Sequence, residues 1–158
     1  MKRSPPEVYL TKPGQFSPSS LTRMAKFVKS HHPFTWPESH LDQCWTIEVE
    51  RDDDPIAYVW FHEIHDKVIE CHAVAHPDSR GRWLTRDLFA MIKDTIINET
   101  DCTACVAQIH HPSIARMWGR LGFVVYPHFA ILKVKDVDDG RTVRITTDAD
   151  NSSPDQGS

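Results

Sequence analysis

One stretch, residues 68–95, constrains the fold more than any other part of the chain; it reads VIECHAVAHPDSRGRWLTRDLFAMIKDT. Its first part, Val68–His76, is rich in apolar residues and predicts a buried strand. Pro77 and Gly81 mark a tight turn. Apolar residues at helical spacing follow and predict a helix with one apolar face: Leu84, Leu88, Met91, Ile92 and Ile96.

The turn in this stretch is basic, since Arg80 and Arg82 flank Gly81. A turn between a strand and a helix can offer backbone N–H groups and the positive end of the helix dipole to an anion. The turn could therefore bind a phosphate group through the amides of Gly81 to Thr85. The other interpretation is a solvated basic turn that only caps the helix.

Length and composition indicate one globular domain. The chain has 158 residues, of which 40% are hydrophobic and 25% charged. Its net charge of −4 gives no support to a nucleic-acid-binding surface. No apolar run is long enough to span a bilayer, and no apolar signal segment follows Met1. The cysteines are too few for a disulfide framework and predict reduced thiols in the cytoplasm: Cys44, Cys71, Cys102 and Cys105.

The segment before the central stretch predicts an arm, a helix and a strand meander. Residues 1–17 form a Pro- and Ser-rich arm in which Glu7–Thr11 could be a strand. Ser17-Pro18 predicts a helix start, and the helix runs to about Ser30. Residues 33–42 are a loop or a short helical turn. Strands at 44–51, 56–64 and 68–76 then form an antiparallel meander.

The segment after the central stretch predicts a strand, a helix and a hairpin. Residues 101–110 contain a buried strand, which should lie parallel to Val68–His76 or near it because a helix connects the two. A second helix starts at Pro112 and ends at Gly122. Residues 123–134 form the last hairpin. The domain is expected to span 18–134, and residues 135–158 form an acidic polar tail with one possible edge strand, Arg141–Thr147.

This element order resembles the GNAT superfamily of N-acetyltransferases over roughly residues 7–134. Two segments carry the motifs: HPDSRGRWLT resembles the family's acetyl-CoA pyrophosphate loop, and HHPSIARMWGRLGF resembles its later helix. The resemblance implies an α/β (α+β) fold, in which helices flank a mixed and largely antiparallel sheet. It also implies acetyl-CoA as cofactor, held by the backbone of Val74–His76 and by Arg80, Gly81, Arg82, Trp83, Leu84, Thr85 and His110.

Two residues on the central strand are candidate bases. Glu70 and His72 alternate on one strand face and could accept the proton of an acceptor amine. The simpler interpretation is a pair of half-exposed strand residues.

The chain departs from the family's pattern at four positions. Trp83 stands at the loop glycine, Thr85 at the second small residue and His110 at the helix asparagine, while Trp118 replaces the tyrosine that often acts as acid. These departures favour an eroded site and a scaffold that binds other protein chains, such as a phage virion or assembly protein. The chain also resembles GNAT-like internal virion proteins of short-tailed phages. The alternative is an active acetyl-CoA-dependent N-acetyltransferase that uses Glu70 or His72 as base.

No metal site is predicted. His62 and His65 are three apart on a strand, so they point to opposite faces and cannot easily share an ion. Cys102 and Cys105 form a lone CxxC at the start of a buried strand, which favours ordinary packing. Without activity, the scaffold would need no cofactor. The expected location is the cytoplasm, or a virion if the chain is phage-encoded.

Overall fold

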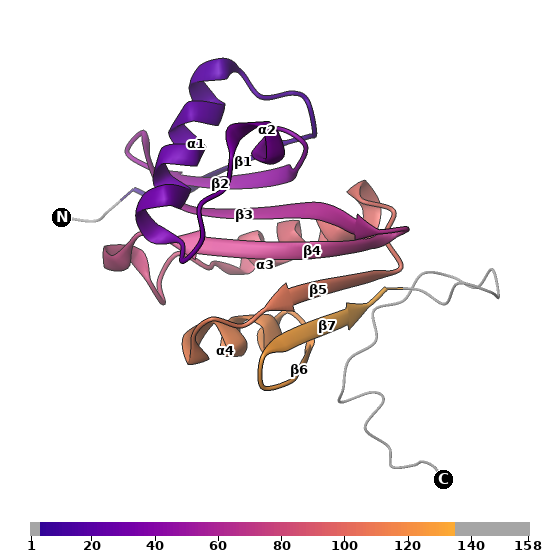
Figure 1. The fold of residues 1–158 in the computed structure, drawn as a ribbon. Coiled ribbons are helices and arrows are strands. Elements are labelled where there is room, and N and C mark those ends of the chain that lie inside the picture. The colour runs from indigo at the N-terminus through magenta and orange to yellow at the C-terminus, as the bar shows by residue number, and fades with distance from the viewer. Residues whose placement is uncertain (1–3, 135–158) are drawn as a thin grey trace, which may run out of the picture. The chain divides into compact units, whose positions relative to one another are not determined.

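The computed structural model describes residues 4–134. The predicted acidic tail and its possible strand Arg141–Thr147 lie outside this range. Within it, seven strands form one sheet in the order β1-β2-β3-β4-β5-β7-β6 (Figure 1). None of the described helices has the length and apolar character needed to cross a membrane.

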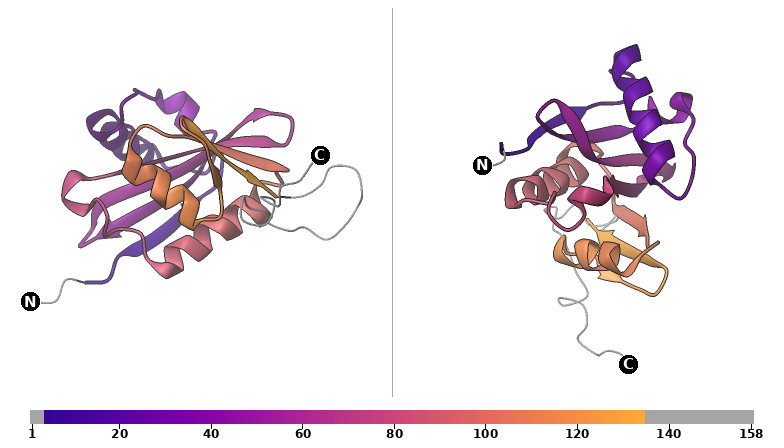
Figure 2. Two further views of the ribbon diagram at one scale, coloured as in Figure 1. Left: turned by 90° about the horizontal axis from the view of Figure 1, so that it is seen from below. Right: turned by 90° about the vertical axis from the view of Figure 1, so that its left-hand side faces the viewer.

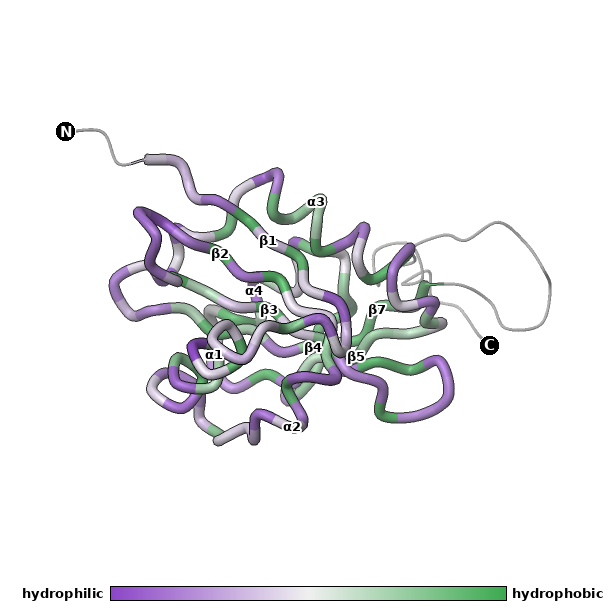
Figure 3. The backbone as a smooth tube through the Cα atoms, turned by 90° about the horizontal axis from the view of Figure 1, so that it is seen from above, coloured by the Kyte–Doolittle hydropathy of each residue, from purple (hydrophilic) through white to green (hydrophobic). Residues whose placement is uncertain are grey.

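The predicted elements are present, with ends that differ by a few residues. The strands are β1 (Glu7–Thr11), β2 (Trp45–Arg51), β3 (Asp54–His65), β4 (Val68–Ala75), β5 (Ala104–Gln108), β6 (Val124–Val125) and β7 (Phe129–Lys133). The helices are α1 (Pro18–His31), α2 (Glu38–Leu41), a 3-10 turn η1 (Pro77–Ser79), α3 (Arg86–Asp94), a π turn η2 (Thr95–Glu99) and α4 (Pro112–Arg120). Hydrophilic residues gather in the turns between these elements (Figure 3).

The chain divides into two compact units. The N-terminal unit runs to His62 and also contains His72–Leu88. The C-terminal unit contains Glu63–Cys71 and, among the described residues, 89–134. The boundary passes through β4, so the phosphate-loop candidate belongs to the N-terminal unit and the GNAT-like later helix to the C-terminal unit.

In the N-terminal unit, helices α1 and α2 cover the strands on one side (Figure 1). β1 pairs antiparallel with β2 over its whole length, and β2 pairs antiparallel with β3. Side chains from α1, α2, β3 and β4, together with Cys44 just before β2, form one core: Met24, Phe27, Val28, Leu41, Cys44, Tyr58, Trp60 and Val74. Full burial of a side chain such as Met24 or Val28 stabilises the fold by about 1.5–3 kcal/mol.

Helix α1 begins where the sequence predicts. The Ser17 hydroxyl accepts a hydrogen bond from the Ser20 amide at 3.2 Å, and Pro18 occupies the first helical turn, where no amide partner is needed. The helix ends at His31 because Pro33 disfavours helical backbone at His32.

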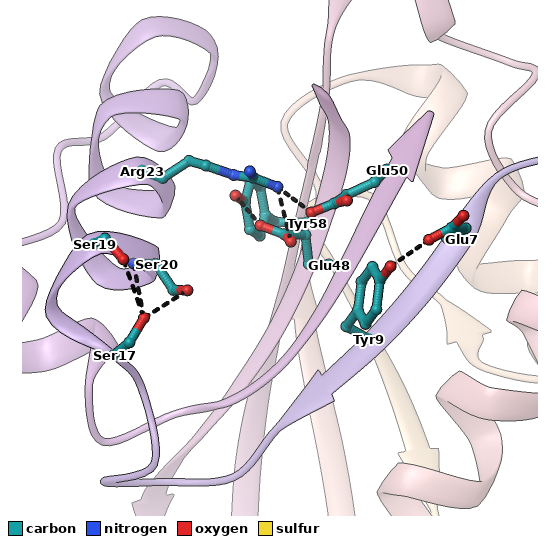
Figure 4. Close-up of polar contacts among 9 residues, drawn as sticks. All are labelled: Glu7, Tyr9, Ser17, Ser19, Ser20, Arg23, Glu48, Glu50 and Tyr58. Atoms are coloured by element: carbon teal, nitrogen blue, oxygen red, sulfur yellow. Dashed lines mark hydrogen bonds and ion pairs between the residues drawn. The ribbon is translucent and has the colours of Figure 1, made fainter. Parts of the chain in front are cut away.

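A polar cluster joins α1 to β2 and β3 (Figure 4). The Arg23 guanidinium donates to the carboxylates of Glu48 and Glu50, and the Tyr58 hydroxyl donates to Glu48. Burial and this bond to Glu48 raise the pKa of Tyr58. The cluster therefore fixes the position of α1 against the strands by directed hydrogen bonds as well as by apolar packing.

In the C-terminal unit, the first half of β4 pairs parallel with β5, from Val68 opposite Ala104 to Cys71 opposite Ala107. This confirms the parallel pairing that the helical crossover predicts. β5 pairs antiparallel with β7, which pairs with β6. Helix α4 lies beside the β6–β7 hairpin (Figure 2).

Helix α4 ends in a Schellman motif centred on Gly122, which has a φ of 95°. The Phe123 amide donates to the Trp118 carbonyl at 3.0 Å, and the Gly122 amide donates to the Gly119 carbonyl at 3.1 Å. The rings of Trp118 and Phe123 pack together with centroids 5.1 Å apart, which is the hydrophobic contact that often accompanies this motif. The LGF segment is thus a structural stop for the helix.

Candidate active site

The turn between β4 and α3 is built by local hydrogen bonds. His76 Nδ1 accepts from the Asp78 amide at 3.1 Å, and the Ser79 amide donates to the His76 carbonyl at 2.8 Å. The Arg82 amide donates to the Ser79 carbonyl at 3.0 Å. Gly81 has a φ of 79°, a left-handed conformation that side chains other than glycine rarely adopt.

Backbone donors collect at the second half of this turn. Within residues 4–134, the amides of Gly81, Trp83, Leu84 and Thr85 donate no hydrogen bond to a protein acceptor. The Thr85 hydroxyl caps α3 by accepting from the Leu88 amide at 3.2 Å. The side chain of Trp83 is buried, whereas Arg80, Gly81 and Arg82 are exposed. The turn thus combines available N–H groups, two guanidinium groups and the positive end of a helix, which suit an anion.

His31, at the end of α1, contacts the start of the same turn. Its ring lies against that of His76 with centroids 5.0 Å apart. Burial lowers the pKa of His31, and the nearby His76 and Arg80 lower it further. Basic groups from α1 and from the turn therefore lie together.

The backbone at the end of β4 alternates between the two strand edges. The His76 amide donates to the Ile56 carbonyl of β3 at 2.8 Å, so Val74 should face the same edge. Ala73 and Ala75 then face the opposite edge. The backbone of Val74–His76 remains a predicted cofactor contact. Within it, the N–H and C=O groups of Ala75 are the best placed, because they face away from β3. The Val74 side chain belongs to the core.

A second group of functional side chains also lies in the N-terminal unit, and we call it the imidazole–indole cluster. It contains His32, Trp36, His40, Trp60, His62 and His72. Its members come from the end of α1, the segment before α2, α2 itself, β3 and β4. The Trp36 and His72 ring centroids are 4.5 Å apart, and those of His40 and His62 are 4.8 Å apart. The predicted base His72 is buried at its centre, with 5% of its surface exposed.

Two indole N–H groups are buried in this cluster. The Nε1 atoms of Trp36 and Trp60 have no hydrogen-bond acceptor within the part of the chain that the structure describes. A buried donor without an acceptor costs about 1–3 kcal/mol. A bound water or an oxygen atom of a ligand would remove that cost.

His72 is hydrogen-bonded to His62 of β3. Their Nε2 atoms lie 3.0 Å apart, and the ring planes differ by only 10°. The ring centroids are 5.2 Å apart. This is close to the largest value possible for that Nε2 separation, because each Nε2 atom lies one ring radius from its own centroid. The rings therefore meet head-on, nearly in one plane, and one Nε2 donates to the other.

The other predicted site residues lie in the C-terminal unit. Glu70 is half-buried, and its carboxylate accepts a hydrogen bond from Gln108 Nε2 at 3.2 Å. His110 is exposed in the bend before α4. Trp118 is buried, with 1% of its surface exposed.

Sequence reasoning missed five members of the cluster: His32, Trp36, His40, Trp60 and His62. The signal was present in part, because the segment HHPFTWPESH concentrates imidazole and indole side chains before α2. Nothing in that pattern tells which strand residues it meets. His62 was considered only with His65, whereas its partner is on the neighbouring strand.

No model of a known protein family matches the chain, and no curated protein matches it. Solved structures do. YncA, a putative acetyltransferase from Salmonella typhimurium determined with its cofactor acetyl-CoA, matches with a TM-score of 0.67 and 13% identity, covering 87% of this chain and 99% of that one. The ribosomal-protein-S18-alanine N-acetyltransferase from Escherichia coli matches with a TM-score of 0.60 and 10% identity, covering 86% and 99%.

A putative acetyltransferase of the GNAT family from Desulfovibrio desulfuricans matches with a TM-score of 0.56 and 16% identity, covering 80% of this chain and 99% of that one. These likenesses extend over nearly the whole length of each solved structure. They agree with the mixed, mostly antiparallel sheet and its flanking helices. The chain therefore has the fold of the GNAT acetyltransferases.

Proposed function

We propose that the chain is an acetyl-CoA-dependent N-acetyltransferase that acts on an amine. The observation that carries the proposal is the turn before α3, where the available amides of Gly81 and Trp83–Thr85 adjoin exposed Arg80 and Arg82. Such a turn suits a pyrophosphate. A structure of the same fold that contains acetyl-CoA supports the assignment.

The donor set of the turn fits this substrate. Arg80 and Arg82 would compensate the phosphate charge, and the turn amides would bind phosphate oxygens. The backbone of Ala75 faces the edge of β4 opposite to β3. It would contact the amide-containing arm of acetyl-CoA, which follows the phosphates. Acetyl-CoA would supply an acetyl thioester to the amine.

Trp83 stands at the loop glycine of the family's pattern, a departure that favours an eroded site. Its side chain is buried, with 6% of its surface exposed, while its amide remains without a described protein acceptor. Thr85, the second departure, caps α3. Both residues therefore have structural roles that are compatible with phosphate binding.

A second candidate function is a scaffold that binds other protein chains without acetyl transfer. The β6–β7 hairpin favours it, because Val125, Tyr126 and Phe129 have 41%, 45% and 39% of their surfaces exposed. The rings of Tyr126 and Phe129 pack together with centroids 4.9 Å apart. An ordered exposed aromatic pair is typical of protein interfaces.

The experiment is an assay of free CoA thiol released from acetyl-CoA in the presence of small primary amines and peptides with free N-termini. The active enzyme should release thiol with at least one amine, and mass spectrometry should find the acetylated amine. Arg80→Glu should raise KM for acetyl-CoA strongly. An absence of amine-dependent release, together with no acetyl-CoA binding, would support the scaffold instead.

A further inference from the structure

The head-on contact of His62 and His72 limits how many protons the two rings can hold. With both rings neutral, one Nε2–H donates to the other Nε2 across 3.0 Å. One added proton gives a monocation in which that hydrogen bond is charge-assisted and therefore stronger. A second would place two N–H groups face to face and break the bond. The contact between the two rings can thus hold one shared proton but not two.

Aromatic faces and other titratable groups surround the pair. Trp60 lies nearly parallel to His72 with centroids 5.4 Å apart, and Trp36 contacts both rings of the pair. Indole faces attract a cation. The other titratable groups against the pair are His32 from the end of α1, with its ring 6.1 Å from that of His72, and His40 from α2. Glu70 is the acidic neighbour two positions away on β4.

We propose that His62 and His72 act as one proton-accepting unit for the acceptor amine. This inference rests on the proposed acetyl transfer. As the amine nitrogen bonds to the thioester carbonyl carbon, its proton passes to the pair. The carbon–sulfur bond breaks with its electron pair on sulfur, and the pair returns the proton to that sulfur. The products are an acetamide and CoA thiol, and the pair ends in its starting state.

His62 is the less buried member and His72 the more buried one. Transfer along the shared hydrogen bond moves charge between these two positions without moving either ring. A single imidazole ring could not move charge between two positions in this way. The pair should therefore fail as a unit when either member is lost.

The shared proton is tested by NMR of the histidine-labelled protein, without any substrate. An imidazole N–H resonance that is far downfield and slow to exchange should be present in the parent and absent in both His62→Gln and His72→Gln. His65→Gln is the matched control, because His65 is an exposed histidine of the same strand, and it should keep the resonance. A parent spectrum without such a resonance would overturn the shared proton.

The catalytic role is tested by the kinetics of the same variants. Loss of a general base costs about 100-fold or more in kcat/KM. We expect that loss for His62→Gln and for His72→Gln, a similar loss rather than a multiplied one for the double variant, and no loss for His65→Gln. The pH profile of kcat/KM should lose its basic-group limb in both single variants.

The outcomes separate this inference from the proposed function. An active parent whose His62→Gln variant keeps its kcat/KM and pH profile contradicts the pair as a unit and leaves acetyl transfer standing. Losses that multiply in the double variant contradict it equally. A parent that binds acetyl-CoA but acetylates no amine contradicts both. Circular dichroism of each variant should match the parent, so that a loss is not one of folding.

Discussion

The imidazole ring of His31 lies edge-on against the ring of His76, with centroids 5.0 Å apart and planes inclined by 63°. His31 ends α1, and His76 begins the turn that leads to α3. The contact therefore joins the helix that covers the N-terminal core to the turn assigned to phosphate binding. Any anion held by the turn should therefore change the electrostatic environment of both imidazole rings.

Acetyl-CoA should raise the pKa of His31. Burial first, and then His76 and Arg80, hold this pKa below its usual value in the unliganded protein. Phosphate charge beside Arg80 would offset the repulsion. An NMR titration with and without acetyl-CoA measures the change, and His31→Gln identifies the resonance. An unchanged titration in a saturated complex would contradict the position given to the phosphates.

The same group predicts a pH effect on stability without ligand. Because the folded pKa is lowered, the unfolded chain binds the proton more readily than the native protein. The contribution of neutral His31 is present above the ordinary histidine pKa of about 6.5 and is lost as pH falls. Denaturant unfolding of the parent and of His31→Gln should diverge below that pH, with the parent losing more stability.

Glu50 should give the opposite pH dependence. Its pKa is raised, mainly by the hydrogen bond with Glu48 and then by burial. The stabilising protonated form is fully present below the unfolded value of about 4.3, and its contribution is lost as pH rises through the folded value. Glu50→Gln should flatten this fall in the free energy of unfolding. Glu63→Gln, at an exposed position of β3, should keep the parent's slope.

Two glycines at the end of α4 should respond to alanine with opposite signs. Gly122→Ala places a side chain at a φ of 95° and should destabilise the fold by about 1–2 kcal/mol. Gly119→Ala lies within the helix, where the added Cβ would meet only Val125 at an ordinary 3.7 Å. It should stabilise by about 0.5–1 kcal/mol. Chemical denaturation measures both, and equal effects would contradict the Schellman assignment.

The four thiols should be unreactive in the native protein. All four cysteines are buried, and burial raises the pKa of Cys44 to about 12. The pKa of Cys71 is also raised, by burial and by its hydrogen bond with Cys105. Because the thiolate is the reactive form, a chromogenic disulfide reagent at pH 8 should react only after denaturation. If one equivalent of thiol reacted rapidly in the native protein, one of these cysteines would be accessible, contrary to the prediction.

Local sequence signals predicted most of the fold. The cap at Ser17, the crossover before β5 and Gly122 each act over a few residues, and each is confirmed. The helix that follows the central turn starts later than its apolar pattern predicts, and its last turn is not α-helical. It starts at Arg86 because Thr85 is its cap, and it widens into a π turn in which the Thr100 amide donates to the Thr95 carbonyl at 3.2 Å. Back-bonding of the Thr95 hydroxyl to Met91 accompanies that widening.

The candidate site was harder to predict because it depends on contacts between distant segments. The turn at Arg80–Thr85 is local, so its residues could be found from sequence. The pairing of His62 with His72 depends on the register of two neighbouring strands, which hydrophobic patterning constrains only by face. The approach of Trp36 and His40 depends in addition on how α1 and α2 pack over those strands.

Calorimetric titration of the purified protein with acetyl-CoA tests the central claim most directly. We predict binding in the micromolar range that Arg80→Glu abolishes. Lys26→Glu, which makes the same charge change at an exposed position of α1, should leave binding intact. Absence of heat with the parent, together with no thermal stabilisation by acetyl-CoA, would contradict the assignment of the turn as a phosphate site.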